Sequence, residues 1–167
     1  ITLSEGESVV DCFLSNNNER IMIASNSGYY NFYSLELNPA GRASIGVKAI
    51  GLKENEYVIG AAIISNSVEY SGILTINNNG RGKITKLEDF SSTSRGARGY
   101  IVQKIEDGES ISTIQAIRAD STKVNVIAGN KLTSMAVSEI PSQGRVTSGV
   151  SLINAKGANT NIYIIQE

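Results

Sequence analysis

Three arginines in this sequence are each followed, four residues later, by a glycine: Arg42 with Gly46, Arg95 with Gly99, and Arg145 with Gly149. A guanidinium group binds phosphate oxygens through parallel N–H donors. A nearby glycine lets main-chain N–H groups approach the same oxygens. The pattern therefore indicates a repeated anion-binding loop. For Arg42 and Arg145 the alternative is a structural role in bracing that loop.

Side chains that usually build catalytic sites are scarce. The chain has no histidine, and Cys12 is its only cysteine. This excludes a Ser-His-Asp or Cys-His arrangement, a zinc site of His and Cys, and a disulfide within the chain. A carboxylate pair is possible, but no spacing marks one. We therefore expect no enzymatic activity and no cofactor, and we expect Cys12, in the apolar run VVDCFL, to be a small buried hydrophobe.

Basic side chains are unevenly distributed along the chain, whose net charge is −1. Residues 1–79 carry four basic and eight acidic side chains, whereas residues 80–104 carry six basic and two acidic ones. The six are Arg81, Lys83, Lys86, Arg95, Arg98 and Lys104. Because affinity for a polyanion is largely electrostatic, this segment is the expected contact region.

The arginine–glycine pairs belong to a longer repeat of about 50 residues. Its three copies span residues 20–65, 72–119 and 123–166, and each ends in a turn followed by an apolar run. Residues 1–15 resemble that ending alone. We therefore expect them to be the last strand of a preceding repeat, and the chain to be a piece of a longer protein.

Within the second copy, apolar runs alternate with turn residues. The runs lie at residues 73–76, 84–87, 100–105 and 111–117. This alternation predicts short strands and hairpins, with a single helical turn at residues 87–90 and at 137–140. Four strands per 50 residues are typical of a propeller blade, which must stack on its neighbours. We predict an all-β, propeller-like domain of three four-stranded repeats and an N-terminal strand; the alternative is a β-sandwich.

The second copy resembles the repeat in the C-terminal domains of DNA gyrase A subunits and their topoisomerase IV counterparts. That repeat has an apolar strand, a Gly-x-Gly-Lys turn, an acidic segment ending in an aromatic residue, and an Arg-Gly-rich loop. Here these features lie at Ile73–Ile76, Gly80–Lys83, Leu87–Phe90 and Arg95–Gly99. The third copy is similar through Gly129–Lys131, Val137–Pro141, Gly144-Arg145 and Gly149-Val150, and the first through Gly41-Arg42 and Gly46-Val47.

The resemblance implies a β-pinwheel, in which neighbouring blades exchange strands. It implies non-sequence-specific binding, wrapping and bending of double-stranded DNA, beside the catalytic core of an ATP-dependent type II topoisomerase in the cytoplasm and nucleoid. Gyrases carry a seven-residue box, Gln-Arg-Arg-Gly-Gly-Arg-Gly. The nearest stretch here, Thr93–Gly99, matches it only at Arg95, Gly96, Arg98 and Gly99, so an intact box is absent from this sequence.

The basic residues supply the candidate DNA contacts. We expect Arg95 and Arg98 to contact phosphates; Arg81 and Lys83 are candidates for either phosphate contact or loop structure. Lys86 and Lys104 belong to the same basic segment, and Arg42, Arg145, Lys131 and Lys48 are further candidates. No motif that reads base edges is present in the sequence, so the expected binding is to the backbone. Six phosphate contacts would give a log–log salt slope of about −5.

A second hypothesis is a β-repeat module that binds protein or carbohydrate and has no role with DNA. The weak net charge and the Asn-rich stretches at 16–18 and 77–79 favour it, although such stretches are also common in turns. Tyr29, Tyr30 and Tyr33 lie in strand-like positions and are expected to pack in the core. No apolar run approaches the ~20 residues of a membrane-spanning helix, so we expect no membrane partner.

Overall fold

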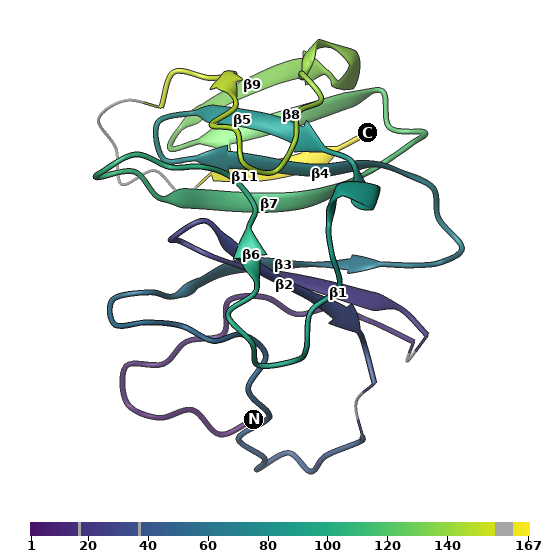
Figure 1. Ribbon diagram of the computed structural model, residues 1–167, viewed down its shortest axis with the longest axis vertical. Helices are drawn as coiled ribbons and strands as arrows, with labels where there is room; N and C mark the ends of the chain where they lie inside the picture. Colours follow the sequence, from purple (N-terminus) through teal and green to yellow (C-terminus); the bar gives the residue numbers. More distant parts are fainter. Residues whose placement is uncertain (17, 37, 156–161) are drawn as a thin grey trace.

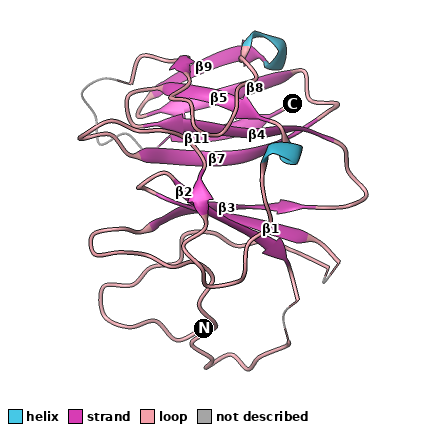
Figure 2. Cartoon of the chain, viewed as in Figure 1, coloured by secondary structure: helices cyan, strands magenta, loops and turns pink. Residues whose placement is uncertain are grey.

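The computed structural model describes residues 1–16, 18–36, 38–155 and 162–167. Its strands are β1 (Arg20–Ser25), β2 (Tyr29–Ser34), β3 (Val58–Ile64), β4 (Tyr70–Asn77), β5 (Arg81–Thr85), β6 (Tyr100–Ile101), β7 (Ile111–Arg118), β8 (Lys123–Ala128), β9 (Lys131–Ala136), β10 (Val150–Ser151) and β11 (Ile162–Gln166). Helical structure in the described residues is limited to two short 3-10 turns, η1 (Leu87–Asp89) and η2 (Val137–Glu139) (Figure 2). Both single turns were predicted from the sequence.

The strands form three antiparallel sheets, stacked one on another (Figure 1). The first sheet has the order β3-β1-β2-β6, the second β10-β5-β4-β7, and the third β11-β8-β9. Each repeat supplies a hairpin and an edge strand to its own sheet. The second and third repeats each have a further short strand that joins the sheet of the repeat before: β6 pairs with β2, and β10 pairs with β5. The predicted all-β, propeller-like fold with strand exchange is confirmed.

Two apolar layers hold the stack together. Between the first and second sheets lie Met22, Phe32, Ile73, Phe90 and Ile114, among others. Between the second and third sheets, a second cluster includes Leu74, Ile117, Val124, Val126 and Ile140. Strand β4 is buried from Gly72 to Asn77 because both faces of its sheet are covered. The repeats are therefore stabilised by contact with their neighbours, as expected for a stacked array.

The turn before the last strand of a repeat has the same geometry in two copies. Lys53 N donates to the carboxylate of Glu56, and Glu106 N donates to that of Glu109, with a left-handed residue at the third position of each turn. Residues 4–7 form this turn as well, since Ser4 N donates to Glu7. Residues 4–7 therefore share the turn geometry that precedes β3 and β7.

The segment after that N-terminal turn differs from the prediction. No strand forms between residues 1 and 16, although Val9, Phe13 and Leu14 are apolar. A strand needs a neighbouring backbone, and in the described structure no sheet pairs with this segment. Cys12 is consequently exposed, and the prediction that it is buried is wrong.

The sequence predicted neither a membrane-spanning helix nor a metal site. None of the described helices has the length and apolar character needed to cross a membrane. Within the described ranges, no three His, Cys, Asp or Glu side chains are grouped so that they could hold a metal ion.

Candidate nucleic-acid interface

The arginine–glycine loops are parts of two exchanged arms. We define the second-repeat arm as residues 91–101 and the third-repeat arm as residues 142–151. Each follows a 3-10 turn, crosses to the preceding repeat and ends in its short strand, β6 or β10. Equivalent main-chain bonds start the two crossings: Thr93 N donates to Phe32 O (2.7 Å), and Gln143 N donates to Ile84 O (2.9 Å). The two arms are thus built alike.

The anchor glycines let the arms approach their host strands. Gly99 and Gly149 have φ of 77° and 76°, a conformation that L side chains rarely adopt. A Cβ atom on Gly99 would lie 1.7 Å from the carbonyl oxygen of Tyr30, and one on Gly149 would lie 2.6 Å from that of Gly82. Gly46 has the same backbone conformation, with φ of 82°, but no atom lies within 4 Å of its Cβ position. The glycines at the two arms therefore serve strand exchange.

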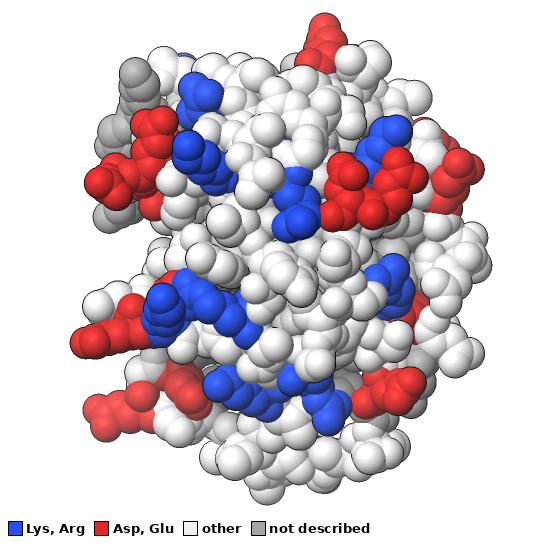
Figure 3. Space-filling model, in the orientation of Figure 1, with Lys and Arg blue, Asp and Glu red and all other residues white. Residues whose placement is uncertain are grey.

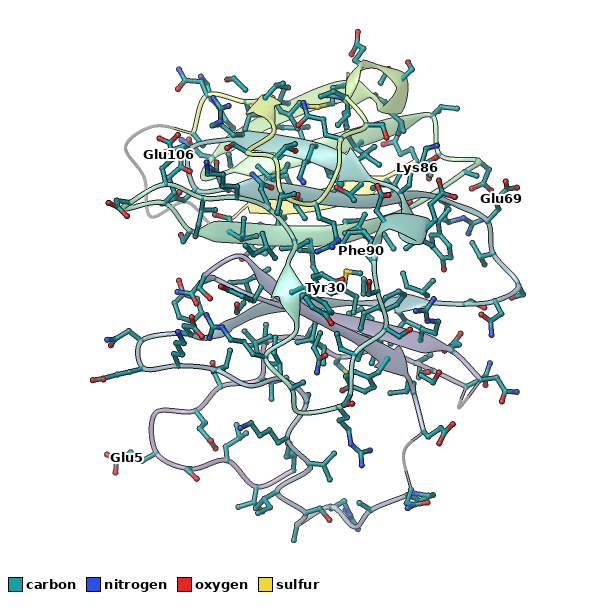
Figure 4. All side chains as sticks on the ribbon, in the orientation of Figure 1. Glu5, Tyr30, Glu69, Lys86, Phe90 and Glu106 are labelled. Carbon is teal, nitrogen blue, oxygen red and sulfur yellow. The ribbon has the colours of Figure 1, made fainter. Side chains whose placement is uncertain are left out.

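Aromatic packing fixes the second-repeat arm at its start. The rings of Tyr30 and Phe90 meet edge to face with centroids 5.0 Å apart, between the first and second sheets (Figure 4). The Tyr30 hydroxyl donates to Ser91 O at 3.3 Å. Tyr30 and Tyr33 are buried, as predicted from the sequence, and Tyr29 lies beneath the guanidinium of Arg98.

Arg98 has an internal partner that the sequence did not indicate. Its guanidinium forms a two-pronged ion pair with the Glu56 carboxylate, at 2.5 and 2.6 Å, and stacks 3.9 Å from the Tyr29 ring centroid. The hydrogen bonds from Arg98 lower the pKa of Glu56 to about 2. Because Nη1 and Nη2 both bond Glu56 and the guanidinium stacks on Tyr29, Arg98 fastens the second-repeat arm to the turn at residues 53–56. Glu56 and Glu109 occupy the same position in the turns of the first and second repeats. Nothing in the sequence indicated that Glu56 would pair with Arg98.

Lys83 is fully buried, so the sequence-based option of direct phosphate contact is corrected. Its ammonium donates to Gly144 O at 2.5 Å and to Arg145 O at 2.7 Å, both in the third-repeat arm. Burial lowers the pKa of Lys83 to about 8. The third-repeat arm, about 60 residues later in the chain, covers the Lys83 side chain and supplies the two carbonyl oxygens that accept its hydrogen bonds.

Arg145 serves as a brace, one of the two alternatives that the sequence left open. Its Nε donates to Asp89 O at 2.7 Å and its Nη1 to Ile101 O at 3.0 Å. The guanidinium carbon lies 5.8 Å from the ring centroids of both Tyr30 and Tyr100. Arg145 therefore ties the third-repeat arm to the second-repeat arm, and the two arms form one continuous surface.

The other predicted cations are exposed and lie on or beside the arms, with two outliers. Arg81 reaches Gly149 O at 2.8 Å, and the backbone N of Lys104 bonds Thr147 O, so both adjoin the third-repeat arm. Arg95 lies in the second-repeat arm, and Lys48 lies beside it, where Gly96 N donates to Ala49 O. Lys86 sits 3.7 Å from Glu88 in an exposed pair, which binds weakly. The outliers are Arg42, in the loop of the first repeat, and Lys131, at the start of β9.

Seen from the side of the arms, basic side chains occur over all three sheets. Figure 3 shows several separate groups of Lys and Arg on this face, with Asp and Glu at its left and right sides and at its top. The face therefore presents cations at several separate points although the net charge of the chain is −1.

Comparisons with known proteins agree with this architecture. The family model described as "DNA gyrase C-terminal domain, beta-propeller" matches residues 36–65, 73–118 and 134–162, more than half of the chain. The chain belongs to this family.

Similar members of the gyrase C-terminal domain family include the DNA gyrase A subunit of Ureaplasma parvum serovar 3, which is 31% identical over 92% of this chain. The DNA gyrase A subunit of Helicobacter pylori strain J99 is 32% identical over 98% of this chain. The chain spans 18% and 20% of these two relatives. The fold also matches a crystal structure of the C-terminal domain of DNA topoisomerase IV, with a TM-score of 0.85 and 19% identity, covering 99% of this chain and 52% of that one.

Proposed function

We propose that this chain binds double-stranded DNA through its phosphate backbone and bends it along the band formed by the arms. The observation that carries the proposal is the joining of the two arms by Arg145 into one surface lined with exposed cations. A duplex presents a regular row of phosphates, so cations spread over stacked repeats can contact it along its length. Contacts with cations on successive repeats would draw the duplex toward the domain and so favour bending.

Six residues are the proposed phosphate contacts on this band. They are Lys48, Arg81, Lys86, Arg95, Lys104 and the unused donors of Arg145. Arg42 and Lys131, exposed in the first and third repeats, are further candidate contacts away from the arms. Arg98 and Lys83 contribute by fastening the arms. The absence of base-reading motifs from the sequence favours binding that is independent of sequence.

The family relationship supports a wider proposal for the parent protein. The two relatives named above are A subunits of DNA gyrase. We infer that the chain acts as an accessory domain beside the catalytic core of an ATP-dependent type II topoisomerase, in the cytoplasm and nucleoid. The domain would itself contribute no catalytic group.

The proposal is tested by fluorescence anisotropy with a duplex of about 40 base pairs of arbitrary sequence, between about 50 and 200 mM salt. Six contacts predict a log–log slope of about −5. A second duplex of unrelated sequence should bind equally well, and a donor–acceptor pair at the duplex ends should report bending. Affinity that does not change with salt, or no binding at the lowest salt, would contradict the proposal and favour a protein- or carbohydrate-binding module.

A further inference from the structure

Asn31 and Lys83 occupy equivalent places in the first and second repeats. Each is buried at the third position of the strand that receives an exchanged arm. Asn31 donates through Nδ2 to Ser94 O at 3.0 Å, and Lys83 donates through Nζ to Gly144 O. Ser94 and Gly144 each immediately precede an anchor arginine. One buried donor therefore fastens each arm at the same point, through an amide in one repeat and an ammonium in the other.

We propose that Lys83 is a positioning residue of the DNA-binding surface, whose buried ammonium group holds the third-repeat arm against β5. It fixes the carbonyls of Gly144 and Arg145 and so sets the place of the Arg145 side chain. Through the same arm it sets Gly149, whose carbonyl receives Arg81. The consequence for DNA rests on the proposed function, whereas the fastening of the arm does not.

The pH dependence of arm opening distinguishes fastening by the Lys83 side-chain nitrogen from simple apolar packing. Burial lowers the pKa of Lys83 to about 8 from its usual 10.5, so the docked arm binds this proton less tightly than an arm that has opened to water. Raising the pH from about 7 to about 9 should therefore hold the arm more firmly, lowering its opening constant about tenfold. A neutral amine keeps two N–H donors, enough for both carbonyls. The charged groups facing Lys83 are Arg145 and Asp89.

The fastening is tested by amide hydrogen exchange, expressed as protection factors at pH 7, 8 and 9, on the full chain and on Lys83→Met. The methionine has a similar length and donates no hydrogen bond. We expect the opening constant of residues 142–151 to rise about tenfold at pH 7 in Lys83→Met, because two carbonyls lose their donor. The wild-type pH dependence should disappear in the variant. Residues 93–97, which are held by the uncharged amide of Asn31 and by main-chain bonds to Phe32 and Ala49 and not by Arg145, are the internal control and should show neither effect.

Either unchanged protection of residues 142–151 in Lys83→Met or a flat pH profile in the wild type overturns the proposal. The wild-type profile decides the question even if the variant does not fold. On DNA, Lys83→Met should weaken binding several-fold while the salt slope stays the same, because no phosphate contact is removed. A slope smaller by about one would instead identify Lys83 as a direct contact and overturn the positioning role. An arm that loosens as expected in a chain that does not bind DNA would refute the proposed function alone.

Discussion

Replacing Gly99 with alanine should destabilise the protein far more than the same change at Gly46. The two glycines share a left-handed backbone, with φ of 77° and 82°, so both substitutions incur a strain of about 1 kcal/mol. At Gly46 this strain is the only cost of the substitution, because no atom lies within 4 Å of the new methyl group. At Gly99 the methyl group would lie 1.7 Å from Tyr30 O, a separation that no side-chain movement can relieve.

The arm in Gly99→Ala must therefore move away from its host strand. Loss of two main-chain hydrogen bonds between β6 and β2 costs about 2 kcal/mol. Partial exposure of the fully buried Val102, whose N–H bonds Gly28 O, adds about 1 kcal/mol. With the strain, the total is about 4 kcal/mol, against about 1 kcal/mol for Gly46→Ala.

Thermal unfolding followed by far-ultraviolet circular dichroism measures the difference. For a chain of this size the two losses correspond to drops in Tm of about 12 °C and about 3 °C. Equal drops would refute the reasoning, because strain without a clash would then explain both variants. A large loss in Gly46→Ala alone would show that the loop of the first repeat, and not the exchanged arm, is the constrained element.

Three further predictions concern single side chains. Glu56→Gln should lower the free energy of unfolding by about 2 kcal/mol at pH 7. This difference should shrink as the pH falls from about 4.5 through about 2, because the pKa of Glu56 is depressed and its pairing with Arg98 is lost when the carboxylate is protonated. Urea unfolding at several pH values checks this prediction. Arg95→Gln should reduce the salt slope of DNA binding by about one, whereas Arg118→Gln, whose side chain pairs with its neighbour Asp120, should leave it unchanged in the same anisotropy assay. Cys12 should react with Ellman's reagent in the folded protein as fast as it does in urea, and a slow reaction without urea would contradict its exposure.

Structural elements that depend only on residues close together in the chain were predictable from the sequence. The hairpins and both 3-10 turns followed from local alternation and turn residues. The pairing of β6 with β2 and of β10 with β5 was implied only by the family resemblance. A strand of two residues carries no periodicity of its own.

The roles of the basic residues show where local sequence patterns fail to predict. Arg81 and Lys83 are two positions apart on β5, yet one is exposed and the other fully buried. The third-repeat arm makes the difference, since it covers Lys83 from about 60 residues away. Arg98 likewise is paired with Glu56, a carboxylate far earlier in the chain. Sequence alone located the cations, and only the tertiary packing separates those that meet solvent from those that fasten the arms.

Strand exchange also imposes a schedule on biosynthesis. The outer edge of β5 is complete once residue 85 has left the ribosome, but its partner β10 begins only at residue 150. At typical translation speeds this edge stays unpaired for several seconds, a period in which another nascent chain could pair with it. Each blade of such a domain thus waits for its successor before it closes, and a pause in translation between residues 85 and 150 would lengthen that vulnerable interval.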